Sequence, residues 1–181
     1  AAQGDDPTLV MRGAHLEGIE PGALSPAEAA GLVTLHPTVQ FRHGLMRSAV
    51  LQTAAPEERR RIFALLGRLT ERPENADQRA WYLAAAAFAP DEALATELER
   101  HAKTANHRGG YLAESAFLAR AAELSPDPEE RGRRYVAAAA AACTGGTHQR
   151  ADVLLESAAS LVHDPVERAR ATLAWSRSNE Q

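Results

Sequence analysis

Histidine and cysteine are the side chains in this sequence best suited to metal binding or nucleophilic catalysis, and their spacing favours neither. The seven histidines are scattered along the chain, at His15, His36, His43, His101, His107, His148 and His163. They form no H-x-x-x-H or H-E-x-x-H motif and no cluster with cysteine, which are patterns typical of zinc sites. Cys143 is alone, follows a run of alanines, and lies far in sequence from any obvious base and orienting acid. We therefore expect Cys143 to be a small buried side chain, and we predict that the chain is not an enzyme and binds no metal.

Two glycine pairs and one arginine run could in principle bind phosphate groups. Gly109-Gly110 and Gly145-Gly146 lack the preceding strand, the lysine and the Ser/Thr of a phosphate-binding loop, so we expect them to end helices. The Arg59–Arg61 run follows Glu57 and Glu58, which is typical of a solvated helix face. The formal net charge of −4 gives no overall attraction to nucleic acid. We therefore predict no direct DNA binding by this segment.

The elements that would position such side chains are mostly helices, and a recurring Pro-x-Glu motif marks where they begin. It occurs at Pro26/Glu28, Pro56/Glu58, Pro90/Glu92, Pro128/Glu130 and Pro165/Glu167. Proline fits the first helical position because no N–H bond is needed there, and the helix dipole favours the acid. We expect helices from Pro56, from Asp77 with Phe88 on its apolar face, and from Pro90. Further helices are predicted over residues 111–124, 128–142, 148–162 and 165–178.

The first third of the chain predicts a different architecture. Asp6-Pro7 favours a helix to about Leu16, and Ser25-Pro26-Ala27-Glu28 has the pattern of a capping box with serine as the N-cap. Residues 32–35 and 39–42 read as two short strands around a loop at 36–38, and a helix follows from about Gly44. Helix, two-stranded wing and helix together predict a winged-helix-like part over residues 1–54.

An internal repeat suggests the architecture of the rest. The segment 127–133, DPEERGR, reappears 37 residues later as DPVERAR at 164–170. This offset is close to the period of about 34 residues in tetratricopeptide repeats. We therefore predict a mainly α protein, in which residues 55–181 form an antiparallel helix-pair, tetratricopeptide-like solenoid. Trp175 near the chain end would lie either on a docked last helix or on a surface for a next repeat, and a homodimer is possible.

Several short motifs occur in order between residues 20 and 175. Residues 41–50 read F-R-H-G-L-M-R-S-A-V, residues 56–60 P-E-E-R-R, and residues 77–87 D-Q-R-A-W-Y-L-A-A-A-A. R-G-G-Y-L-A at 108–113 and A-A-E-L-S-P-D-P-E-E-R at 121–131 follow. This order resembles the region behind the ATPase module in LuxR-type transcriptional regulators of the MalT-like, STAND class. One departure is Gly44, where that family usually has proline.

The resemblance implies a division of labour. Such regulators bind ATP in an N-terminal P-loop domain, bind DNA with a C-terminal helix-turn-helix, and receive a small-molecule inducer or a protein partner on their helical repeats. This chain would be the middle segment, so it would carry no cofactor itself, and ATP would belong to the P-loop domain that this fragment lacks. By the same resemblance, His43 would read the nucleotide phosphates together with Arg47 one turn later. The alternative is that His43 only caps a helix or packs beneath the hairpin.

The remaining expectations concern location and class. No apolar run approaches the roughly 18 residues that suggest a membrane span, and no leader pattern occurs at the first residues, so we expect a cytoplasmic protein without membrane contact. The absence of an initial methionine suggests a fragment or a processed product. An alternative to the regulator segment is a free-standing helical-repeat adaptor for protein–protein interaction, unrelated to transcription.

Overall fold

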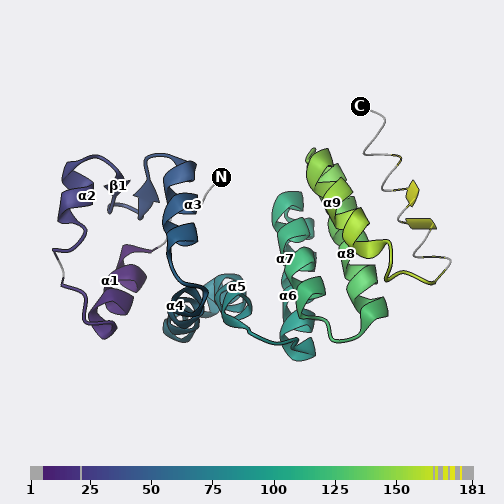
Figure 1. The fold of residues 1–181 in the computed structure, drawn as a ribbon, viewed down its shortest axis with the longest axis horizontal. Helices are drawn as coiled ribbons and strands as arrows, with labels where there is room; N and C mark the ends of the chain where they lie inside the picture. Colours follow the sequence, from purple (N-terminus) through teal and green to yellow (C-terminus); the bar gives the residue numbers. More distant parts are fainter. Residues whose placement is uncertain are drawn as a thin grey trace. The chain divides into compact units, whose positions relative to one another are not determined.

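The computed structural model describes residues 6–20, 22–164, 166, 169–170, 172–173 and 176. These residues form helices with short links and one two-stranded antiparallel hairpin, which confirms a mainly α fold (Figure 1). The chain divides into two compact units, Ala1–Ala86 and Ala87–Gln181. The helices between residues 55 and 86 thus belong to the first compact unit. The boundary expected between the winged-helix-like part and the helical repeats, after residue 54, stays a prediction. No helix of the described part is long and apolar enough to cross a membrane.

The first unit begins with two short helices. Helix α1 (Pro7–Leu16) starts as predicted, because the Asp6 carboxylate accepts a 2.9 Å hydrogen bond from the Thr8 N–H. Helix α2 (Ser25–Ala29) begins one residue earlier than the capping box predicted. The Ser25 N–H is bonded to the Gly22 carbonyl in the preceding turn, which places Ser25 inside the helix and leaves its side chain without a capping role. The prediction of Ser25 as N-cap was therefore wrong.

The hairpin lies between α2 and α3 and is shorter than predicted. Strands β1 (Val33–Thr34) and β2 (Gln40–Phe41) pair in antiparallel register, with Val33 opposite Phe41 and Thr34 opposite Gln40. Val33 is buried, and the His36–Pro37 peptide bond in the loop is cis. Helix α3 (Gly44–Thr53) follows directly and packs against β2.

The first unit ends in a tightly packed helix pair, α4 (Pro56–Leu69) and α5 (Ala76–Ala86), joined through the 3₁₀ turn η1 (Pro73–Asn75). A Cβ atom at Gly67 would lie 2.7 Å from Cδ2 of Leu83, so the missing side chain permits this close contact. Helix α1 packs on α4 and is linked to it by a 2.7 Å ion pair between Glu17 and Arg61. Helix α5 ends before Phe88, which was predicted on its apolar face and is 86% exposed.

Between residues 87 and 164, the second unit contains four consecutive helices, each packed on the next: α6 (Glu92–His107), α7 (Tyr111–Leu124), α8 (Pro128–Thr144) and α9 (His148–Ala158). Pro128 occupies the first turn of α8 as predicted, and the Asp127 carboxylate caps that helix through the Glu130 N–H at 2.9 Å. The prediction of a start at Pro90 was wrong, because Asp91 is the N-cap of α6 and accepts from the Leu94 N–H.

The glycine pairs end helices as predicted. Gly109 and Gly146 adopt φ values of 73° and 74°, a conformation that closes a helix and that residues with a Cβ rarely adopt. Helix α9 ends at Ala158, earlier than predicted, and the N–H groups of Ala159 and Leu161 bond to carbonyls three residues back, a tighter pattern than that of the α-helix. The helix predicted over 165–178 lies largely outside the described residues, as do Pro165, Glu167 and Trp175.

Small side chains form much of the core of the second unit. Its main apolar cluster contains Ala102, Leu118, Ala119, Ala138, Ala139, Ala142, Cys143, Ala151, Leu154 and Leu155. Cys143 is a buried free cysteine, as predicted. Because alanine side chains are small, they let α8 pack closely against α7 and α9. A Cβ atom at Gly132 would lie 2.8 Å from Cγ2 of Val162 and 3.2 Å from the Leu161 carbonyl carbon, so this position also depends on the missing side chain.

Candidate functional site

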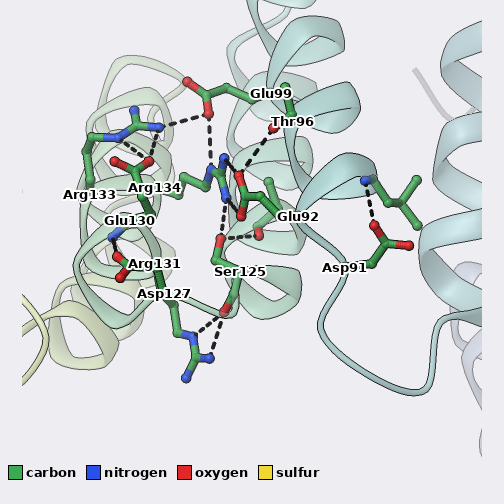
Figure 2. A network of polar contacts seen from close by, with 12 residues as sticks. Asp91, Glu92, Thr96, Glu99, Ser125, Asp127, Glu130, Arg131, Arg133 and Arg134 are labelled. Atoms are coloured by element: carbon green, nitrogen blue, oxygen red, sulfur yellow. Dashed lines mark hydrogen bonds and ion pairs between the residues drawn. The ribbon is translucent and has the colours of Figure 1, made fainter.

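The most extensive polar cluster in the described part of the chain surrounds Arg134, an α8 side chain that is only 3% exposed (Figure 2). Its Nη2 donates to Oε1 of Glu92 at 2.6 Å, and its Nη1 donates to Oε2 of the same carboxylate at 3.0 Å. Its Nε donates to Oε2 of Glu99 at 3.0 Å. The paired bonds to Glu92 have the two-pronged geometry in which a guanidinium binds a carboxylate most strongly.

The positions of the partners follow from the helices that carry them. Glu92 begins α6, and Glu99 lies two turns later on the same side of that helix. Ser125 is the C-cap of α7, fully buried, and its hydroxyl accepts from Arg134 Nη1 while donating to the Ala121 carbonyl at 2.8 Å. One guanidinium therefore connects the start of α6, the end of α7 and the middle of α8.

Two further arginines surround this centre. Arg133 Nη2 lies 2.9 Å from Glu99 Oε2 and 2.8 Å from Glu130 Oε2. Arg131 donates twice to the Ser125 carbonyl, from Nε at 3.1 Å and from Nη2 at 2.7 Å (Figure 2). The Ser125 carbonyl follows the last turn of α7, where backbone acceptors lack helical partners, so Arg131 satisfies an acceptor that the helix leaves open.

The electrostatics of the cluster keep its groups charged. The hydrogen bond from Arg134 lowers the pKa of Glu92 and raises the pKa of Arg134. Burial opposes ionisation of Glu99, but hydrogen bonds from Arg133 and Arg134 outweigh it and lower the pKa of that carboxyl. A general acid or base needs a pKa near the working pH. Here the carboxyl pKa values are lowered and the pKa of Arg134 is raised, so all three move further from neutral pH. The cluster is therefore suited to holding helices together and unsuited to proton transfer.

Several side-chain contacts in the second unit join residues about one helix pair apart. Arg133 and Arg134 contact Glu99, at separations of 34 and 35 residues. Arg150 Nε lies 3.4 Å from Ser115 Oγ, 35 residues away, and links α9 to α7. The Glu129 carboxylate accepts from the backbone N–H groups of His163 at 3.3 Å and Asp164 at 3.0 Å, 34 and 35 residues further on. These contacts join α6 to α8, α7 to α9, and α8 to the segment that follows α9.

The two residues singled out from the sequence lie elsewhere, at the start of α3. His43 is the exposed N-cap residue of that helix, and its carbonyl accepts from the Met46 N–H at 3.0 Å. His43 thus occupies the capping position, although its imidazole makes no capping hydrogen bond. Arg47 is exposed one turn later. The exposure of both side chains is compatible with phosphate binding, and nucleotide sensing stays a prediction.

Sequence reasoning missed the residues of the Arg134 cluster. Glu92 was assigned only to the helix dipole, and Glu99 and Arg134 carried no motif. One feature of the sequence could have indicated these contacts. Glu99 lies 34 and 35 residues before Arg133 and Arg134, a spacing close to the predicted repeat length. Among the residues that the structure describes, no three His, Cys, Asp or Glu side chains are grouped so as to hold a metal ion.

Comparison of the chain with protein-family models, with curated proteins and with solved structures gives no significant match.

Proposed function

We propose that this chain is a non-catalytic signalling and interaction segment of a LuxR-type, ATP-dependent transcriptional regulator, whose helical repeats receive a protein partner or a small-molecule inducer. The order of the sequence motifs between residues 20 and 175 supports the class of regulator. The packing of α6 to α9 supports the role of the repeats.

The observation that carries the proposal is the set of contacts across 34 or 35 residues. In a helix-pair solenoid each repeat contacts its neighbours, so equivalent positions of successive repeats are adjacent. The contacts of Glu99 with Arg133 and Arg134 and of Ser115 with Arg150 have this property. On this reading α6/α7 and α8/α9 are two repeats, and the Arg134 cluster holds the first helices of both in a fixed arrangement. A rigid array of this kind can bind a partner without doing chemistry.

The order of elements in the first unit supports a winged-helix-like part. Helix α2, the β1–β2 hairpin and helix α3 follow one another with links of only a few residues. In the proposed regulator this part would transmit the state of the repeats to the ATPase module, with His43 and Arg47 facing the nucleotide phosphates.

The coding sequence on either side of these residues tests the class of protein. We expect a P-loop motif upstream and a helix-turn-helix pattern downstream. A reading frame with neither would overturn the regulator assignment and favour the free-standing adaptor.

A reporter assay tests the role of the repeats. In the regulator with its flanking domains, replacement of residues 87–164 by an unrelated helical array should abolish the transcriptional response to inducer and leave ATP binding intact. An unchanged inducer response would show that the signal enters elsewhere.

A further inference from the structure

A small cavity open to solvent lies in the first unit, between α1 and the turn that joins α4 to α5 (Figure 1 shows these helices). Its volume is about 140 Å³. Its lining comes from the segments 6–12 and 69–72 and from Asn75 and Gln78, and we call it the α1/α4 cavity. A closed apolar cavity of about 150 Å³ holds a molecule of the size of benzene. The α1/α4 cavity therefore fits a small ligand, whereas drug-sized ligands occupy pockets of about 300 Å³ or more.

The buried part of the lining is mainly apolar. Leu9 of α1 is buried and Leu69 of α4 is half-buried. Thr70 is also buried, but its hydroxyl donates to the Leu66 carbonyl at 2.8 Å, so its proton is already used within the protein. Because α1 packs on α4, these side chains are held in place. This part of the cavity is suited to an aliphatic group.

The exposed part of the lining carries charges of both signs. The guanidinium groups belong to Arg12 and Arg72, and the carboxylates to Asp6 and Glu71. Among the residues that the structure describes, the side chains of Arg12, Glu71 and Arg72 form no ion pair. Asp6 caps α1 with Oδ1, which leaves Oδ2 for another donor. The cavity can therefore bind a negative group and a positive group together.

The helix ends and the neutral side chains at the cavity favour the same kind of ligand. The start of α1 favours a negative group and the end of α4 a positive one, because of the helix dipoles. The Gln78 amide donates to the Tyr82 hydroxyl at 3.0 Å, which leaves its oxygen as an acceptor. A metal cation would face two guanidinium groups, and a simple anion would face two carboxylates, so both are disfavoured. A ligand with both charges avoids these repulsions.

We propose that the α1/α4 cavity binds a free α-amino acid with an aliphatic side chain. Arg12 and Arg72 would pair with its carboxylate, and Asp6 and Glu71 with its ammonium group. Its side chain would cover the apolar part of the lining. The site stands independently of the regulator assignment, because it uses only residues of the first unit and requires no ATPase or DNA-binding domain.

A heteronuclear NMR titration of the full chain with L-leucine tests the proposal. The comparison ligands are isocaproate, which is leucine without its ammonium group, and isoamylamine, which is leucine without its carboxylate. For a ligand of about nine non-hydrogen atoms we expect a Kd of about 0.1–1 mM. The backbone amide signals of Leu9 and Gln78 should shift saturably. Both comparison ligands should bind at least about tenfold more weakly, because each lacks one charged partner.

Two variants test which side chains bind each end of the ligand. Arg72→Gln should weaken L-leucine binding about tenfold but leave the affinity for isoamylamine equal or higher. Glu71→Gln should weaken L-leucine binding by a similar factor but leave the affinity for isocaproate equal or higher. The matched controls are Arg68→Gln and Glu74→Gln, which remove the same charges nearby without touching the cavity lining and should leave the affinity unchanged. All four side chains are exposed, so each variant should retain the dispersed spectrum of the parent, which separates lost binding from lost folding.

Several results would contradict the proposal. They are no saturable shift below about 10 mM L-leucine, shifts confined to residues outside the cavity lining, or equal affinity for isocaproate or isoamylamine. Tighter binding of inorganic phosphate or succinate would make the cavity an anion site instead. An equal loss of affinity in Arg68→Gln or Glu74→Gln would show that only the general charge of this region matters.

Discussion

Arg134 on α8 binds Glu92 on α6 through two parallel N–H···O bonds of 2.6 and 3.0 Å. The two residues are 42 positions apart, and α7 lies between their helices in the sequence. The guanidinium is buried while the Glu92 side chain is 45% exposed, so the pair reaches from the interior of the second unit to its surface. A change at Arg134 therefore affects buried partners that water cannot replace.

Replacing Arg134 by leucine should destabilise the chain by about 3–5 kcal/mol. The substitution removes the two-pronged partner of Glu92 and one of the two arginines that bind Glu99. It also leaves the fully buried Ser125 hydroxyl with only its bond to the Ala121 carbonyl. Arg134→Lys should recover only part of the loss, because an ammonium cannot form the two-pronged bond. Urea unfolding followed by circular dichroism measures both. Lys103→Ala is the control: its side chain is 72% exposed and 3.9 Å from Glu99, so a change of less than about 0.5 kcal/mol is expected.

Stability of the second unit should fall in acid because of Glu92 and Glu99. Their pKa values in the folded chain lie below the ordinary value of 4.5, so the folded state binds fewer protons than the unfolded state in that range. The stabilisation is therefore complete above pH 4.5 and is lost as the pH falls through the folded pKa values. Unfolding midpoints measured in urea from pH 7 to about pH 3 should show this decline. The double variant Glu92→Gln, Glu99→Gln should be less stable at pH 7 but should decline less steeply; a parallel curve would contradict the assignment.

The sequence predicted the features that depend on neighbouring residues and missed those that depend on packing. Asp127 and Pro128 define the start of α8 by local hydrogen bonding, and the glycine at 109 ends α6 by its own backbone preference. The errors at Ser25 and Pro90 are shifts of one or two residues, where a neighbouring turn or a competing cap decided the start. The burial of Arg134 could not be predicted, because arginine is rarely buried and its partners lie on α6 and at the end of α7.

Gly132→Ala should destabilise the chain, by about 1–3 kcal/mol. A Cβ at this position would lie 2.8 Å from a Val162 methyl group and 3.2 Å from the Leu161 backbone, so α8 and the segment after α9 would have to separate. Gly44→Ala is the matched control with the opposite sign. Gly44 lies in a helix, and no atom is within 4 Å of an added Cβ. The substitution should therefore stabilise the chain by about 0.5–1 kcal/mol, because alanine lowers the conformational entropy of the unfolded state. Differential scanning calorimetry compares them; a higher midpoint for Gly132→Ala would contradict the close contact.

Gly146→Ala should cost about 1 kcal/mol for a purely conformational reason. The residue adopts φ of 74° at the end of α8, and nothing lies within 4 Å of an added Cβ, so no clash contributes. Asparagine tolerates this conformation better than alanine, so Gly146→Asn should recover part of the loss. Thermal unfolding of the two variants separates a conformational cost from a steric one. Asparagine is the larger side chain, so a greater loss for Gly146→Asn than for Gly146→Ala would indicate that space, and not the backbone conformation, limits this position.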